Sequence, residues 1–188
     1  LLFILLVSLP ISTQAATFII DKDHSEIGFK ARHMVLTTVR GEFKDYKVDL
    51  NLDQDDLTNS SVKVIIDASS IDTDNQKRDN HLRSEDFLYV EEHPEIRFES
   101  REIEKTSDGY TIIGDLTIRG VTREVEIPVE MTGKIKDLAG KTRYGFEAEL
   151  TINRHDYNIN WDKTLDSGGL VVSENIGIEI YVEAVEKG

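Results

Sequence analysis

Five histidines and a cluster of charged residues are the side chains of this sequence that could carry chemistry. His24, His33 or His81, together with a carboxylate such as Asp79, could build a site for zinc or another divalent metal. No H-x-H or H-E-x-x-H spacing occurs, however. The alternative is that these histidines cap strand ends or lie in hydrogen-bonded corners. Both interpretations stay open at this point, and the sequence favours a chain without a bound metal.

The stretch from Asp72 to Ser100 interrupts an otherwise regular alternation of apolar and polar residues. Its residues 75–86 are strongly charged, which predicts a short polar helix or an ordered loop. Lys77, Arg78 and Arg83 could bind an anionic head group such as a phosphate. They could equally form salt bridges with neighbouring carboxylates on a hydrated surface.

Other reactive chemistry has little support in the sequence. Ser25 follows His24, but no G-x-S-x-G nucleophile motif is present. Glycine-rich phosphate-binding motifs are missing, which disfavours nucleotide cofactors. The chain has no cysteine, so thiol nucleophiles and disulfides are excluded. We therefore expect no catalytic residue and no cofactor.

Composition limits the partners of this protein. The 188 residues contain 22 Lys and Arg against 36 Asp and Glu, a formal net charge of −14. Nucleic acids and anionic membrane surfaces both require a basic footprint, so neither is expected as the main partner. A high negative charge fits a soluble exported protein. Because a cysteine-free chain is not a disulfide-stapled secreted module, we expect the bacterial periplasm.

Residues 1–16, LLFILLVSLPISTQAA, predict a secretory signal peptide cleaved after Ala15 or Ala16. The apolar run is shorter than the roughly 20 residues that a transmembrane helix needs, so we expect no stable membrane anchor. An initiator methionine and a basic start are missing, which indicates that the sequence is truncated at its N-terminus. Residues 17–188 are long enough for one domain, and no repeat or linker divides them.

Most of this domain alternates apolar and polar residues with the period of two that is typical of half-buried strands. A short strand start is expected at 17–21. The eight longer strands are expected at His24 to Met34, Gly41 to Asp53, Ser61 to Ser69, Glu95 to Glu104, Tyr110 to Arg119, Arg123 to Ile135, Arg143 to Asn153 and Asn175 to Val185. Phe43 is out of phase in its strand, which predicts a bulge near Lys44 or Asp45. Pro128 predicts that its strand lies at a seam or a bulge.

Eight amphipathic strands joined mostly by short turns favour an all-β, up-and-down antiparallel barrel. Inward side chains that fill such a barrel would make a solid core, and side chains that line a void would make a slot for an apolar molecule. A strand of ten residues spans about 33 Å before tilt. The slot would therefore suit a long chain better than a compact ring system.

Several motifs together resemble one known family. They are Asp23-His24-Ser25 with Phe29 and His33, Gly41-x-Phe43, Ser70-Ile71-x-Thr73, Arg78-Asp79-x-His81-Leu82-Arg83-Ser84-x-Asp86-Phe87, His93-Pro94-x-Ile96-x-Phe98, Gly114-Asp115-Leu116-Thr117-Ile118-Arg119-Gly120-Val121-Thr122 and Asn153-Arg154-x-Asp156-Tyr157. In this order, over about residues 18–184, they resemble the YceI family of polyisoprenoid-binding proteins.

The resemblance implies an eight-stranded, lipocalin-like antiparallel barrel with a short helical or loop insertion, exported to the periplasm. It implies a ligand such as a polyprenyl chain, an isoprenoid quinone or a fatty amide held inside the barrel, and a possible homodimer. Arg78, His81 and Arg154 are then expected near the polar end of the ligand. The apolar lining candidates are Ile27, Phe29, Val48, Leu50, Ile66, Phe98, Leu116, Ile118, Ile127, Val129, Phe146, Leu150, Ile178 and Ile180.

A binding protein is thus the expected function, for transport, storage or a stress response. Two alternatives remain from the residues themselves. One is a metal-dependent enzyme of the cell envelope that uses a site of histidines and carboxylates. The other is a structural barrel whose inward side chains leave no cavity.

Overall fold

The structure is a computed structural model, and it describes residues 17–34, 36–164 and 170–187. Nearly all of the regular structure in these residues is β-strand. The strands are β1 (Phe18–Ile20), β2 (Glu26–His33), β3 (Thr37–Phe43), β4 (Tyr46–Asn51), β5 (Ser61–Asp67), β6 (Ile71–Asp72), β7 (Glu95–Thr106), β8 (Gly109–Ile118), β9 (Val121–Lys136), β10 (Thr142–Asn153) and β11 (Val172–Glu186). The helices are α1 (Gln76–Arg83) and the 3-10 turns η1 (Lys22–His24), η2 (Leu57–Asn59), η3 (Ala68–Ser70) and η4 (Arg154–Tyr157).

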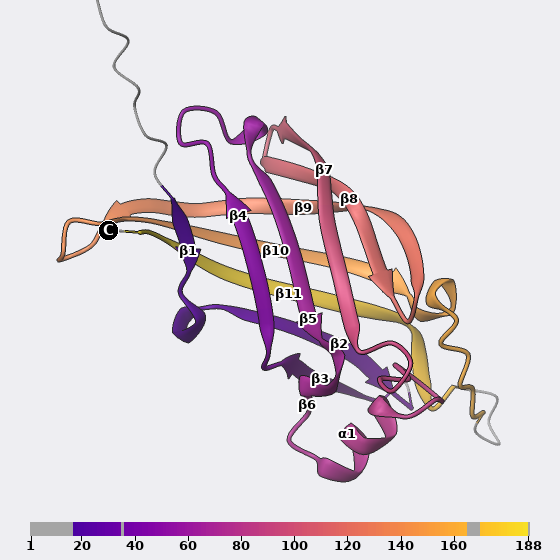
Figure 1. Cartoon of the computed structure of the whole chain (residues 1–188). Coiled ribbons are helices and arrows are strands. Elements are labelled where there is room, and N and C mark those ends of the chain that lie inside the picture. The colour runs from indigo at the N-terminus through magenta and orange to yellow at the C-terminus, as the bar shows by residue number, and fades with distance from the viewer. Residues whose placement is uncertain (1–16, 35, 165–169, 188) are drawn as a thin grey trace, which may run out of the picture.

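All of these strands belong to one antiparallel sheet that curls on itself. The hydrogen-bonded order is β4-β5-β7-β8-β9-β10-β11-β2-β3-β6, and β1 pairs with the C-terminal part of β11. Figure 1 shows β4, β5, β7 and β8 crossing in front of β9, β10, β11 and β2, so that the two halves of the sheet face each other. The expected all-β barrel class is confirmed.

Strand β9 connects the two halves because it changes its partner along its length. Residues 121–129 pair with β8, and residues 129–136 pair with β10. Pro128 lies at this change of partner, next to Val129, which has a partner in both strands. The prediction that Pro128 marks a seam is confirmed.

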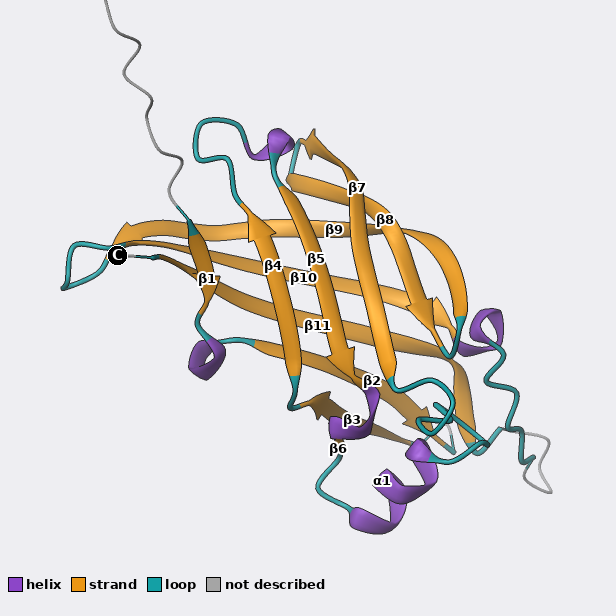
Figure 2. Ribbon diagram, in the orientation of Figure 1, coloured by secondary structure: helices purple, strands orange, loops and turns teal. Residues whose placement is uncertain are grey.

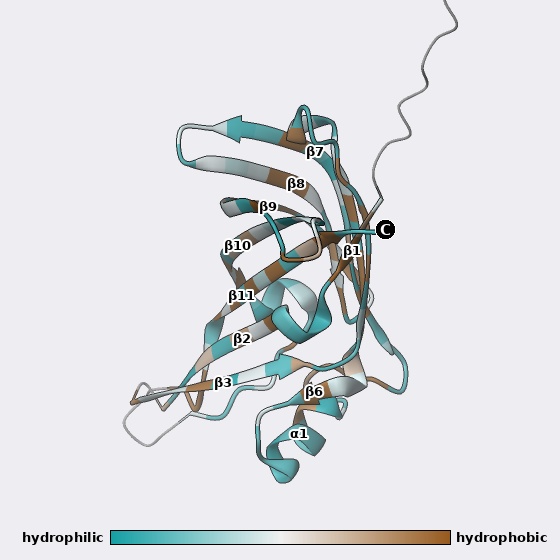
Figure 3. Cartoon of the chain, turned by 90° about the vertical axis from the view of Figure 1, so that its left-hand side faces the viewer, coloured by the Kyte–Doolittle hydropathy of each residue, from teal (hydrophilic) through white to brown (hydrophobic). Residues whose placement is uncertain are grey.

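The alternation in the sequence becomes an apolar inside and a charged outside. Phe98 and its two register partners, Val64 and Leu116, face inward. Arg97 and Glu99, which flank Phe98 along β7, are exposed. Figure 3 shows hydrophobic and hydrophilic residues alternating along the strands, whereas α1 is mostly hydrophilic.

Helix α1 lies beside β3 and β6 at one end of the barrel (Figure 2). Its N-cap is Asn75, whose side chain accepts a hydrogen bond from the N–H of Arg78 at 3.0 Å. The helix ends before Ser84, whose N–H donates to the carbonyl of His81. The expected short polar helix is therefore present, with eight residues.

The two long edges of the sheet meet without a ladder of hydrogen bonds among the described residues. Instead, β4 packs against β1 and η1. The Tyr46 hydroxyl donates to the Ser25 carbonyl at 3.0 Å, and the Lys22 ammonium nitrogen lies 5.1 Å from the centroid of the Tyr46 ring. Side chains, rather than backbone pairing, hold this seam together.

Two sequence predictions need correction. The described residues form eleven strands instead of eight, because β1 and β6 are short and one predicted strand divides. The predicted strand from Gly41 to Asp53 is the end of β3 and all of β4, separated by a bend at Lys44 rather than joined through a bulge. The predicted signal peptide at 1–16 lies outside the described residues. The one α-helix of the described part is neither long nor apolar enough to cross a membrane.

Candidate functional site

An apolar cavity of about 330 Å³ runs through the inside of the barrel. All eleven strands contribute side chains to its wall. The fourteen apolar residues expected from the sequence all lie there, namely Ile27, Phe29, Val48, Leu50, Ile66, Phe98, Leu116, Ile118, Ile127, Val129, Phe146, Leu150, Ile178 and Ile180. Their contact with a ligand remains a prediction.

The inward side chains do not fill this interior. Phe29, Val64, Ile112 and Ala148 line the cavity, yet they are only partly buried. In native cores, side chains interdigitate with few voids larger than a water molecule. The barrel is therefore hollow, which argues against the structural barrel with a solid core.

The cavity is elongated. Along β11 the wall includes Ile176, Ile178, Ile180 and Val182. Six residue steps at roughly 3.4 Å each correspond to a length of about 20 Å. A space of this length and apolar character accommodates an extended hydrocarbon chain.

A second hydrophobic cluster closes the end of the cavity next to β1. It contains Phe18, Leu52, Tyr144 and Ala184, each less than one tenth exposed. The rings of Phe18 and Tyr144 meet edge to face, with centroids 5.4 Å apart. This end of the barrel is thus plugged by the protein itself.

The opposite end is formed by segments outside the strands. Leu82 of α1 and Phe87 contribute from one side, and Tyr157 and Ile159 contribute from the other. Trp161 lies between the two sides, with its ring centroid 5.3 Å from that of Phe87. These aromatic contacts join two segments that are far apart in the sequence.

Arg154 anchors this end. Its side chain is 3% exposed and lines the cavity. The guanidinium donates to the carbonyls of Ser173 and Ile159, at 3.1 and 2.6 Å, and to the Asp162 carboxylate at 2.5 Å. The bond from Arg154 holds the pKa of Asp162 below its usual value. Because its donors already have protein partners, Arg154 serves to fix the segment after η4.

Tyr157 is the buried polar residue of the cavity wall that sequence reasoning missed. It is 1% exposed, and its hydroxyl finds no hydrogen-bond partner within the described residues. Burial raises the pKa of this hydroxyl to about 12. The phenol is therefore neutral at physiological pH, and a buried hydroxyl without a partner destabilises the folded state.

Arg78 and His81 are not part of the cavity wall, although the His81 ring packs edge to face against Phe87, which is, with centroids 4.9 Å apart. Their place near the polar end of a ligand stays a prediction. Arg78 donates to the hydroxyl and the carbonyl of Thr73, both at 2.7 Å. The buried Asp79 accepts from the Thr73 N–H and hydroxyl. His81 forms a hydrogen bond of 2.8 Å with Asp86. Arg78 and Asp79 therefore fasten α1 to the chain before it, and His81 fastens it to the chain after it.

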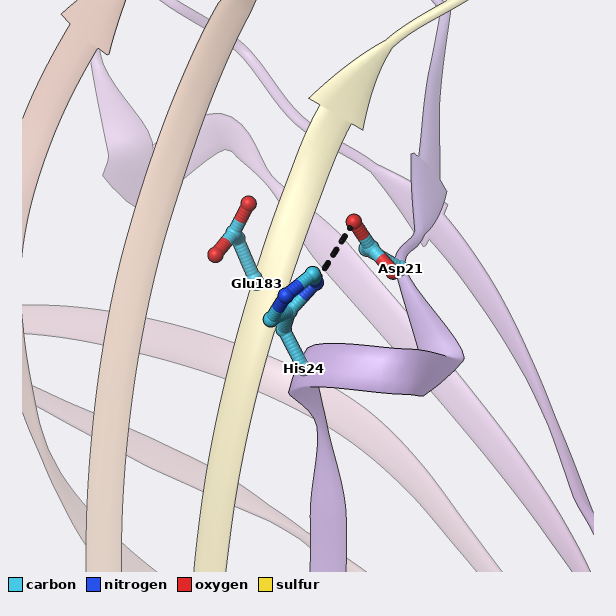
Figure 4. A group of neighbouring side chains, drawn as sticks. All are labelled: Asp21, His24 and Glu183. Carbon is cyan, nitrogen blue, oxygen red and sulfur yellow. Dashed lines mark ion pairs between the residues drawn. The ribbon is translucent and has the colours of Figure 1, made fainter.

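The metal ligands considered from the sequence do not come together. In the described part of the chain, the one group of three potential ligands is Asp21, His24 and Glu183, and it includes neither His33 nor Asp79. Figure 4 shows His24 between the two carboxylates, with Nδ1 3.1 Å from Oδ2 of Asp21. The hydrogen bond that His24 donates to the Asp21 carboxylate raises the pKa of His24.

Arg143 already pairs with these carboxylates. Its guanidinium pairs with Asp21 at 2.8 Å, with Asp137 at 2.9 Å and with Glu183. The hydrogen bond from Arg143 lowers the pKa of the Asp21 carboxyl, and its hydrogen bond to Asp137 lowers the pKa of that carboxyl as well. A divalent cation would have to displace Arg143, so we interpret the group as an ion-pair network that joins β1, β10 and β11.

Some of the lining residues that the sequence prediction did not include lie outside the strands. Leu82, Phe87, Tyr157 and Ile159 line the cavity, but a strand period cannot assign them an inward face. Their signal was composition, because each is a large apolar or aromatic residue within or beside a polar run. Such residues outside strands often pack against a neighbouring element.

Comparison with known proteins places the chain in a family. Residues 18–184 match the model of the YceI-like domain. A UPF0312 protein of Staphylococcus epidermidis is 40% identical over 167 residues, which covers 88% of this chain and 95% of that protein.

Solved structures have the same fold. The YCEI protein of Campylobacter jejuni superposes with a TM-score of 0.72 at 32% identity, covering 89% of this chain and 96% of that one. A polyisoprenoid binding domain from Saccharophagus degradans superposes with a TM-score of 0.64 at 12% identity, covering 92% and 99%. With the hollow antiparallel barrel and the match over nearly all of the described chain, these similarities establish that the protein belongs to the YceI-like family.

Proposed function

We propose that this protein binds a long-chain lipid, an isoprenoid or a similar amphiphile, inside its barrel. The observation that carries the proposal is the apolar cavity of about 330 Å³, which is elongated along β10 and β11. Burial of apolar ligand surface supplies about 25 cal/mol per Å², offset by the cost of ordering the ligand. An extended apolar chain buries the most surface against such a wall and therefore gains the most binding free energy.

A solved structure of similar fold agrees with this proposal. The Saccharophagus degradans domain of similar fold is described as polyisoprenoid binding. At 12% identity it supports the fold, and the ligand class comes from the cavity of this chain. We therefore propose a polyprenyl chain, an isoprenoid quinone or a fatty amide as the ligand.

A binding role agrees better with the cavity wall than an enzymatic one. Arg154 is held by three protein acceptors, and the Tyr157 hydroxyl lies buried at the edge of the wall. Neither is paired with a general base or a nucleophile among the described residues. We further propose that the protein is exported to the periplasm and that it carries the lipid for transport, storage or a stress response.

Extraction of the purified protein tests the proposal. Native mass spectrometry should show a complex heavier than the polypeptide, and organic extraction should release an apolar lipid that chromatography and mass spectrometry identify. Delipidated protein should take up a long polyprenol again. Protein that purifies at the mass of the polypeptide and takes up neither polyprenol nor quinone nor fatty amide would refute the function.

A further inference from the structure

The tip of the β9–β10 hairpin combines exposed apolar side chains with lysines. Ile135 is 63% exposed and Leu138 is fully exposed, and both lie in the segment Lys134–Lys141. Ile19 of β1 is 49% exposed at the same end of the barrel. Figure 1 shows this hairpin projecting beyond the other strands, next to β1 and the C-terminus. We call residues 134–141 together with Ile19 the amphiphilic tip.

The strand register places Ile19 and Ile135 on one outer surface, and Leu138 lies in the turn that follows Ile135. Ile19 pairs with Val185, Val185 pairs with Arg143, and Arg143 pairs with Ile135. Directly paired residues of an antiparallel sheet point to the same face. The neighbouring row, which contains Tyr144 and Ala184, faces the buried cluster. Three of the six large apolar residues that are exposed in the described chain therefore lie at the amphiphilic tip.

The charge of the amphiphilic tip is opposite to that of the whole protein. The segment 134–141 contains Lys134, Lys136 and Lys141, all exposed, and one acid, Asp137. Its formal charge is therefore +2, in a chain of −14. Asp137 does not project with the lysines, because its carboxylate accepts from the N–H groups of Ala139 and Lys141 and from the Arg143 guanidinium.

The acids behind the amphiphilic tip are also engaged inside the fold. Arg143 pairs with Asp21 and Glu183. The Glu186 carboxylate accepts from the N–H of Thr142 at 3.1 Å. Lys136 and Lys141 are thus exposed while these carboxylates are turned to internal donors, and the Lys134 ammonium lies 5.0 Å from the centroid of the Tyr144 ring.

The hairpin holds the apolar residues in place. The Asp137 N–H donates to the Lys141 carbonyl and the Gly140 N–H donates to the Asp137 carbonyl, both at 2.9 Å. Gly140 has a φ of 79°, which a glycine adopts without strain. This ordered turn keeps Leu138 away from the body of the protein.

From these features we propose that the amphiphilic tip docks the protein onto the surface of a bilayer that contains anionic phospholipids. The lysines match the negative surface potential, and each basic residue near such a surface strengthens binding by roughly fivefold. Ile135, Leu138 and Ile19 would enter the boundary between head groups and acyl chains. The net charge of the whole chain disfavours binding to an anionic membrane surface. The local positive charge of the amphiphilic tip favours such binding, because the charge is unevenly distributed.

Vesicle co-sedimentation tests the docking independently of any ligand. The full chain is mixed with one of two vesicle types. One consists of phosphatidylcholine alone, and the other of equal parts of phosphatidylcholine and phosphatidylglycerol. Residues 1–16 carry no charge, so a difference between the two vesicle types reports on the rest of the chain. We expect binding to the anionic vesicles to be at least tenfold stronger, although the net charge of −14 alone would give the reverse.

Two double variants examine the two properties of the amphiphilic tip. Lys134→Gln with Lys141→Gln should lower binding to anionic vesicles at least tenfold, and Ile135→Ser with Leu138→Ser should weaken binding to both vesicle types. The matched controls are Lys47→Gln with Lys63→Gln on β4 and β5, and Leu36→Ser at another exposed turn. They change the same residue types elsewhere and should leave binding unaltered.

Three results would overturn the proposal. One is an absence of preference for anionic vesicles at an ionic strength of about 0.1 M, where charges act over about 10 Å. Another is equal binding by the tip variants and their controls. The third is a wild-type dimer in sedimentation equilibrium that the tip variants abolish, because the surface would then be an interface between two copies of the chain.

Discussion

Replacing Ala148 by phenylalanine should block the cavity. Ala148 lies midway along the lining residues of β10, and its partners in the neighbouring strands are Val129 and Ile180. The added ring is the size of benzene, which a cavity of about 150 Å³ accommodates. It would take up nearly half of the roughly 330 Å³ that the barrel encloses.

The expected loss of affinity follows from the ligand carbon atoms that the ring displaces. A benzene-sized volume corresponds to about six buried carbons, and at about 0.8 kcal/mol per CH₂ their burial contributes about 5 kcal/mol. The net loss of binding free energy is smaller, because a flexible ligand that is partly displaced has fewer bonds to order on binding and so a lower entropic cost. We therefore expect the affinity for a long polyprenol to fall at least 100-fold, which is about 2.7 kcal/mol.

Titration of delipidated protein with the polyprenol, followed by native mass spectrometry, measures the effect. The matched control is Thr151→Phe, which adds a ring of the same size at an exposed position of the same strand. Thermal unfolding should show that both variants are folded. Equal polyprenol affinities for the folded Ala148→Phe and Thr151→Phe proteins would show that the cavity is not the lipid site.

Three further predictions concern stability and ionisation. Arg154→Met should lower the free energy of unfolding by about 3 kcal/mol. This value is at the lower end for a broken buried ion pair, because Asp162 is half exposed. Urea denaturation that shows no loss of stability would contradict the anchoring role of Arg154. Tyr157→Phe should raise the free energy of unfolding of the delipidated protein by about 1 kcal/mol by removing an unpaired buried hydroxyl, so a loss of similar size in the same assay would reveal a partner for it. His24 has a raised pKa, so the stabilisation from its pairing with Asp21 is complete below pH 6.5 and is lost as the pH rises through the folded-state pKa. NMR titration should show Asp21→Asn lowering the His24 pKa, and an unchanged value would exclude the pairing.

The sequence predicted the barrel and most of its wall because the period of two is a local signal. Phe98 and its register partners Val64 and Leu116 all face inward, as the alternation in each strand predicts. The break between β3 and β4 was misjudged, because Phe43 out of phase is compatible with either a bulge or a new strand. Only the pairing partners distinguish the two, and they are distant in sequence.

The charged motif of α1 was harder to interpret for a related reason. An arginine in a polar segment has the same pattern whether its acceptor is a ligand or the protein's own backbone. Arg78 binds Thr73 five residues away, and Arg83 donates to the carbonyls of Ser69 and Ile71. These acceptors are carbonyl and hydroxyl oxygens of η3, of β6 and of Thr73, and no pattern of residue types predicts them.

The seam between β4 and the β1–η1 segment has a consequence for the girth of the barrel. A barrel closed all around by backbone pairing has a diameter set by its strand number and stagger. Here the closure rests on apolar packing and on contacts such as that of the Tyr46 hydroxyl with the Ser25 carbonyl. A slightly wider barrel therefore requires repacking of a few side chains and leaves every ladder of the sheet intact. Barrels of this architecture can in this way differ in the width of the space that they enclose.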